Sequence, residues 1–308
     1  SFTSKQDSAA AADSLRGVER QRARLDSLLR AGADTTMALE RRSEVTSPEE
    51  GPRRAHPPPR VANKKGLNSF NWNLRYPDAS SFDDMIMWAG GTQGPVAAPG
   101  TYLVRMKVDG TEVGTDTIVV KKDPRSKATQ ADLREQFAFL IKIRDRVTQA
   151  NDAVKQIRSI RQQLDERDKS LGGANAIAAM VLSKALRETI GMVEDSIYQT
   201  KNRSSQDPLN YPIRLNNKLA ALSGVVSTAD ARPTDQSYGV FNVLSAQLDL
   251  QLATLKRAVD TLVPKLNTAL ADLKLAPIDP EKPLEVKGEG KAAGEDEDDE
   301  EEEGGRWW

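Results

Sequence analysis

The chain has 308 residues, of which 38% are hydrophobic and 29% are charged, an ordinary balance for a globular protein. It has no cysteine and one histidine, His56, which excludes disulfides, thiol nucleophiles and metal sites built from cysteine or paired histidines. The net charge of −1 conceals nine consecutive acidic residues at 295–303, so the rest of the chain is basic overall. No apolar run reaches the roughly 18 residues of a membrane-spanning helix.

Residues 1–62, which precede any sheet-like pattern, contain three segments of different composition. Residues 1–4 (SFTS) read as the end of a strand whose start is missing, so we expect a C-terminal fragment of a longer protein. Apolar residues at helical spacing predict a partly exposed helix over 5–30. Residues 31–62 are polar and then proline-rich, which predicts a disordered or extended linker.

Residues 63–125 have the alternation of β-strands. In SFNWNLRY, the residues Phe70, Trp72 and Leu74 fall on one face and polar residues on the other. The stretch APGTYLVRMKVDG alternates in the same way and ends in a dipeptide typical of hairpin turns. We therefore expect a small antiparallel β-sandwich of the immunoglobulin or fibronectin type, with Trp72 in its core.

From residue 126 the apolar period becomes helical, which makes the whole chain a multi-domain α+β protein. Near-heptad spacing over more than 30 residues indicates a long helix that needs partners. We expect 126–276 to form an antiparallel bundle, followed by a disordered acidic tail over 277–308 that either solvates the protein or docks on a basic surface. The expected helices are a long one capped by Thr129 or Ser126 and ended by Gly172-Gly173, a second over 174–202, a short one over 213–227, and a last long one after Thr234 that ends at Pro277.

The motifs of common catalytic sites are missing from this sequence. It contains no nucleophile elbow, phosphate-binding loop or dinucleotide-binding glycine pattern, and His56 lies among prolines, where nothing would orient it. Asp83 and Asp84 are adjacent and would point in different directions. The arginines of 142–169 alternate with acidic residues, which is typical of a solvated helix face and not of a nucleic-acid interface. We expect no catalytic residue, metal site, cofactor or nucleic-acid partner.

Five residues are candidates for ligand contact. Trp72, Tyr76 and Trp88 are aromatic residues that could stack on a ligand, although core packing of the same rings is the simpler interpretation. Asn210 and Tyr211 lie between two prolines in the stretch 207–222. That stretch is either a recognition loop or an ordered connector whose neighbouring asparagines satisfy loop backbone.

Four segments together carry a resemblance to a known family: GLNSFNWNLRYPDASSF, MIMWAGGTQGPVAAPGTYLVRMKVDG, KKDPRSKATQADLREQFAFLIKIRD and QDPLNYPIRLNNKLAALSGVV. Over most of 60–276 the chain resembles the C-terminal region of large bacterial β-propeller proteins of the sialidase-repeat (BNR), sortilin-like type, often labelled glycosyl hydrolases. Its β-part also looks like the immunoglobulin-like module of flagellar hook-capping proteins.

The resemblance implies that a propeller precedes Ser1 in the same polypeptide and that SFTS completes a strand of the sandwich, interrupted by an insertion over 5–62. It also implies export, hence an extracellular or periplasmic location. The hydrolase label concerns the propeller, and no catalytic residue of the family maps onto this chain.

These observations favour a non-catalytic accessory region of a larger exported β-propeller protein, which mediates protein contacts, above all with its own propeller. One alternative is a carbohydrate-binding module that uses the exposed aromatic rings on glycans. The other is a part of a glycoside hydrolase whose catalytic propeller lies outside this chain.

Overall fold

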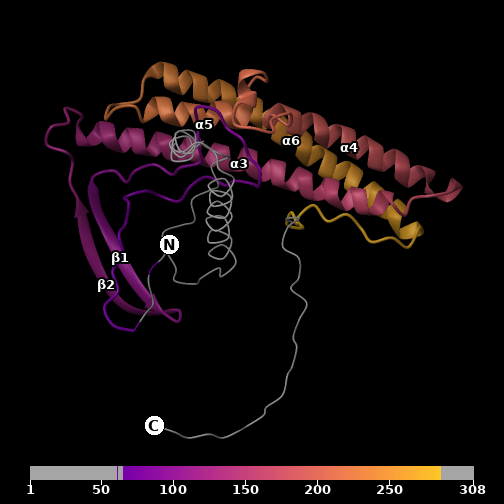
Figure 1. Cartoon of the computed structure of the whole chain (residues 1–308), viewed down its shortest axis with the longest axis horizontal. Helices are drawn as coiled ribbons and strands as arrows, with labels where there is room; N and C mark the ends of the chain where they lie inside the picture. The colour runs from indigo at the N-terminus through magenta and orange to yellow at the C-terminus, as the bar shows by residue number, and fades with distance from the viewer. Residues whose placement is uncertain (1–60, 62–64, 286–308) are drawn as a thin grey trace, which may run out of the picture.

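The computed structural model describes residues 61 and 65–285 (Figure 1). A two-stranded antiparallel sheet is followed by four helices, so the mixed α+β class is confirmed. The expected strand end at 1–4, the helix over 5–30, nearly all of the linker over 31–62 and the acidic run at 295–303 lie outside the described residues. The elements are β1 (Gly100–Val108), β2 (Thr111–Val120), α3 (Gln130–Asp168), η1 (Ala174–Ala176), α4 (Ile177–Ile197), η2 (Asp207–Leu209), α5 (Leu215–Val226) and α6 (Asp235–Asp272).

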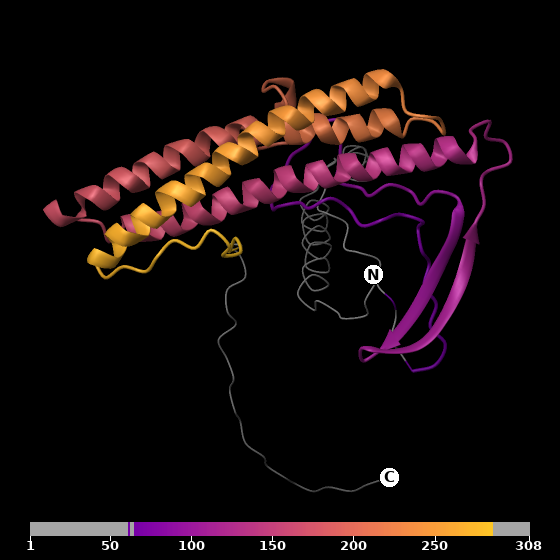
Figure 2. The same ribbon diagram turned by 180° about the vertical axis from the view of Figure 1, so that it is seen from behind.

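The four helices lie lengthwise against one another and make up the elongated part of the molecule (Figures 1 and 2). Helix α3 runs away from the hairpin, α4 and then α5 return toward it, and α6 runs outward again. Helix α4 contacts α3 and α6, and α5 contacts the same two helices. None of these helices, in the part of the chain that is described, is both long and apolar enough to span a bilayer. The largest fully buried side chains are Phe139, Ile143, Ile157, Ile160, Leu164, Leu186, Ile190, Ile197, Leu219, Leu248, Leu266 and Leu270.

Both long helices begin at a threonine. The side chain of Thr129 accepts a hydrogen bond from the backbone N–H of Asp132 at 3.1 Å, and the Asp132 carboxylate accepts one from the Thr129 N–H at 2.9 Å. This reciprocal capping satisfies two of the N–H groups that a helix start leaves free, and the hydrogen bonds from Thr129 lower the pKa of Asp132. Thr234 caps α6 with its side chain, which accepts a hydrogen bond from the N–H of Ser237 at 3.2 Å.

The end of the helical part differs from the expected disordered tail. Residues 277–285 are ordered and fold back along α3 (yellow in Figure 1). The Gln163 amide of α3 both donates to the carbonyl and accepts from the N–H of Asp279, each at 2.8 Å. In the same way, the Asn267 amide of α6 donates to the carbonyl of Ile278 and accepts from its N–H, and Ile278 is 2% exposed. The segment is ordered because side chains of two helices, α3 and α6, supply hydrogen-bond partners to its proline-rich backbone.

The β-part is also smaller than a sandwich among the described residues. Strands β1 and β2 form a hairpin, and segments 74–79 and 92–97 are joined by an isolated bridge between Arg75 and Val96 and by a few backbone hydrogen bonds. The strand expected around Trp72 is absent because Leu74 has a φ of 60°, which an extended strand does not allow. The expected contact of Trp72 with the hairpin does form, since its ring meets Tyr102 edge-on at 5.3 Å.

Between these two parts, segment 78–91 lies against the helices and approaches α5 so closely that only glycine fits at one position. A Cβ built on Gly90 would lie 2.7 Å from the backbone nitrogen of Ala221, whereas one on Gly91 would meet nothing within 4 Å. Both glycines have φ values that other residues adopt, so the two positions differ only in the space around them.

We therefore predict that Gly90→Ala lowers the free energy of unfolding by about 2 kcal/mol, because the segment must move off α5, while Gly91→Ala changes it by less than about 0.5 kcal/mol. Urea denaturation followed by circular dichroism measures both values. Equal effects of the two substitutions would contradict the close approach.

Candidate functional site

Two of the candidate aromatic residues, Trp72 and Tyr76, connect the segment that contains them to the hairpin and to α3. The Trp72 indole N–H donates to the Arg75 carbonyl at 3.2 Å, and its ring packs on Tyr102 of the hairpin. The Tyr76 ring meets Phe137 of α3 edge-on at 4.8 Å. Both candidate rings are half-buried, so they join the extended segment to the hairpin on one side and to the helices on the other.

Trp88 is held by its backbone and leaves its ring partly free. Its N–H donates to the Asn217 side chain at 2.8 Å, and its carbonyl accepts from the same amide at 2.6 Å. Asn216 in turn donates to Asn151 of α3, whose amide donates to the Ser80 carbonyl at 2.6 Å. The interpretation of this stretch as a connector whose asparagines satisfy loop backbone is thus confirmed for Asn217. The Trp88 side chain remains 39% exposed.

The other two candidates lie in the loop between α4 and α5. Asn210 is exposed and ends the short helix η2. Tyr211 is 37% exposed, and the ammonium group of Lys201 lies 5.7 Å from the centre of its ring. Neither residue lines the cavity beside Trp88, so the structure does not bring the five candidates into one site.

A buried charge cluster was not expected from the sequence. Glu194 of α4 is 1% exposed, and its two carboxylate oxygens lie 2.9 Å from Arg158 Nε and 2.7 Å from Arg161 Nη1 of α3. The Arg158 guanidinium also covers the ring of Phe82 at 4.5 Å, and Phe82 packs edge-on against Tyr198. Because both arginines neutralise the carboxylate from fixed positions, the cluster has the character of a structural anchor between α3, α4 and segment 78–91.

Tyr198 extends this anchor by its hydroxyl group. It accepts a hydrogen bond from the Ile86 N–H at 3.1 Å and lies 3.3 Å from the Asp84 carbonyl, to which it donates. Burial raises the pKa of Tyr198, so the hydroxyl stays protonated and keeps both interactions over the physiological pH range. Asp83 and Asp84 themselves are exposed. No group of three potential metal ligands occurs within the described residues.

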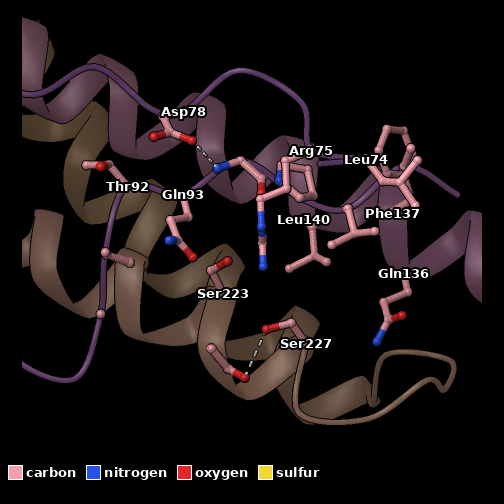
Figure 3. A pocket seen from close by; sticks show the side chains of 18 of the residues that line it. Leu74, Arg75, Asp78, Thr92, Gln93, Gln136, Phe137, Leu140, Ser223 and Ser227 are labelled. Carbon is pink, nitrogen blue, oxygen red and sulfur yellow. Dashed lines mark hydrogen bonds between the residues drawn. The ribbon is translucent and has the colours of Figure 1, made fainter. Parts of the chain in front are cut away.

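A cavity of about 1290 Å³ has Trp88 among its lining residues, and Figure 3 shows part of its wall. Its walls are segment 85–99, the hairpin base at 120–123, α3 and α5. Figure 3 shows polar side chains reaching into the space from several elements, with Arg75 near the middle and the apolar residues Phe137 and Leu140 beside it. This is the place in the described chain where a small molecule would fit best.

The second exposed feature is one face of the hairpin. In the antiparallel register Val104 pairs with Asp116 and Tyr102 with Ile118, so that alternate residues share a face. One face carries the apolar residues Tyr102, Val104, Met106, Val108, Ile118 and Val120, together with Gly114 and the single acidic residue Asp116, and we call it the apolar hairpin face. The opposite face is mainly polar and carries Thr101, Leu103, Arg105, Lys107, Glu112, Thr115, Thr117 and Val119.

Comparison of the chain with known protein families, with curated protein sequences and with solved structures finds no match in any of the three. The resemblance to sialidase-repeat proteins therefore stays a prediction, and the function has to be argued from the features above.

For the asparagine that holds Trp88, we predict that Asn217→Ala lowers the free energy of unfolding by about 2–3 kcal/mol, because two backbone groups lose their partner. Asn210→Ala is the matched control, since this exposed side chain has no such task, and should have an effect below about 0.5 kcal/mol. Urea denaturation of both variants checks this. A stable Asn217→Ala protein would show that water can replace the amide.

The buried charge cluster gives a second matched pair. Glu194→Gln leaves two arginines facing a neutral amide, and we expect a loss of about 3 kcal/mol in unfolding free energy. Glu188 is the control, because its carboxylate lies 3.9 Å from the Lys184 ammonium group on an exposed helix face. Glu188→Gln should lower the free energy of unfolding by less than about 0.5 kcal/mol. Denaturation curves at neutral pH compare the two, and similar midpoints would mean that the cluster is well solvated.

Proposed function

We propose that this chain is a non-catalytic interaction region of a larger exported protein, and that the apolar hairpin face is where it binds the rest of that protein. The hairpin would then be part of an immunoglobulin-like sandwich whose other strands come from polypeptide outside the described residues. The exposure of the apolar hairpin face is the observation that carries the proposal.

Four apolar side chains of that face are exposed, whereas Tyr102 and Val120 are half-buried. Val104, Met106, Val108 and Ile118 are 45%, 60%, 47% and 38% exposed. Covering such a side chain fully contributes about 1.5–3 kcal/mol, and a hairpin of two strands is marginal in water by itself. Contiguous apolar surface of this kind on a soluble domain marks an interaction site. Its alternation with a mainly polar face indicates a partner on one side only.

The partner we propose is β-structure of the same polypeptide. Segment 65–75 already contacts the hairpin through Trp72 and Tyr102, and residues 1–60 are connected directly to it. The resemblance to β-propeller proteins supports a propeller as the body that this region docks on, and with it an extracellular or periplasmic location.

The carbohydrate-binding alternative is supported by one specific observation. Trp88 is 39% exposed at the rim of a large cavity that has polar walls, and exposed aromatic rings of this kind can stack on apolar sugar faces. Trp72 and Tyr76 give less support, because both rings pack against other aromatic rings of the chain.

To test the interaction face, a lysine is placed on either side of the hairpin in this chain, co-expressed with the polypeptide that precedes it. Met106→Lys faces Gly114 across the strands, so no acidic side chain lies directly opposite the new charge. A buried unpaired charge at the interface should weaken association at least about tenfold. Thr117→Lys on the opposite face should leave the affinity within about twofold.

Association is measured by calorimetric titration or by co-purification of tagged chains. Wild-type affinity in Met106→Lys, or an equal loss in Thr117→Lys, would contradict docking through the apolar hairpin face. Absence of any association in the wild type would remove the propeller as the partner.

A further inference from the structure

The cavity beside Trp88 contains an arginine that no acidic residue neutralises. Arg75 Nη1 donates to the Gly94 carbonyl at 2.9 Å, and this is the guanidinium's single hydrogen bond within residues 65–285. In contrast, the helix arginines Arg158 and Arg187 each bind carboxylates. Figure 3 shows the Arg75 side chain extending into the open space of the cavity.

From this geometry we infer that the cavity is a binding site for an organic anion, whose carboxylate or phosphate group is held by Arg75. The inference is independent of the hairpin and of the proposed function.

The guanidinium is already oriented for this task. The bond to Gly94 fixes the plane of the group and leaves its other N–H donors for a ligand, and a planar array of donors matches carboxylate and phosphate oxygens. Because the side chain is positioned before binding, a ligand loses less conformational entropy when it docks.

The backbone around Arg75 is shaped in an unusual way. Leu74 has a φ of 60° and Ala89 a φ of 51°, and both line the cavity. A positive φ is unfavourable for a branched residue such as leucine, and such positions gather at functional sites. At Leu74 the turn separates Trp72, which packs on the hairpin, from Arg75, which enters the cavity.

Neighbouring side chains suit an anion with a larger body. Figure 3 shows Gln93 and Ser223 turned toward the same space as Arg75, and neither side chain has a hydrogen-bond partner among the described residues. Phe137 and Leu140 form an apolar wall beside them. A volume of about 1290 Å³ exceeds the 300–1,000 Å³ of usual small-molecule sites, so the anionic group would occupy only one end.

The acidic residues of the cavity are engaged or lie at its edge. Asp78 accepts the Gly94 N–H at 2.8 Å, and Asp123 pairs with Arg125 at 2.8 Å. Asp230 is exposed, and two lysines, at 121 and 122, offset it at the hairpin base. Among the described residues no carboxylate forms an ion pair with Arg75, and the nearest acidic residue along this segment, Asp78, binds the N–H of Gly94 while Arg75 binds its carbonyl.

The test titrates the full chain with three probes that share a phenyl ring: benzoate, its neutral near-isostere benzamide, and phenyl phosphate. We expect at least one anion to bind at least tenfold more tightly than benzamide, measured by chemical-shift changes in ¹⁵N-labelled protein. The two anions distinguish a carboxylate site from a phosphate site. Arg75→Gln should weaken the anion at least tenfold, and Ser223→Ala, which leaves the Gly94 bond intact, about threefold.

Arg105→Gln is the control, because it removes the same charge from the exposed polar face of the hairpin, and it should leave affinity within twofold. Three results would overturn the inference: benzamide binding as tightly as both anions, no shift with either anion at tens of millimolar, or equal losses in Arg105→Gln and Arg75→Gln. The Met106→Lys protein should bind the anion normally, so failure of hairpin docking and failure of this site can be told apart.

Discussion

The structure depends on how an extended segment without sheet partners is held against helices. Segment 78–91 brings backbone N–H and C=O groups to the surfaces of α3, α4 and α5, and buried backbone groups must find hydrogen-bond partners. Side chains supply them: Asn217 pairs with both groups of Trp88, and Tyr198 binds the Ile86 N–H. Glu194 also holds Arg158 over the ring of Phe82, so the helices contact segment 78–91 through this side chain as well.

This way of packing has a consequence for the hairpin. Residues that the alternation assigned to a neighbouring strand are used against α3 instead, as Tyr76 shows by its contact with Phe137. Among the described residues, the hairpin is covered in part by the ring of Trp72, which packs on Tyr102. The helices do not need the hairpin for their own core, which makes its uncovered face available for another body.

The sequence was informative where the physics is local. Helical periodicity and a capping threonine predicted the start of α3, and the Asp109-Gly110 turn predicted the hairpin. It failed where partners are distant along the chain. Nothing near Glu194 indicates that it pairs with Arg158, and composition alone made 277–285 a tail although Gln163 and Asn267 order it. The cavity arginine was assigned to the polar face of a strand, because the turn at Leu74 has no signature in its residue types.

The aromatic cluster around Trp72 now has a structural reason. Within five residues the chain contacts the hairpin with Trp72, turns at Leu74, enters the cavity with Arg75 and contacts α3 with Tyr76. Large rings suit such a junction because each buries much surface with few rotatable bonds. The same rings fix the position of Arg75 from both sides. This constrained junction places the charged group of Arg75 in open space. Packing alone does not require such an arrangement, whereas a binding site does.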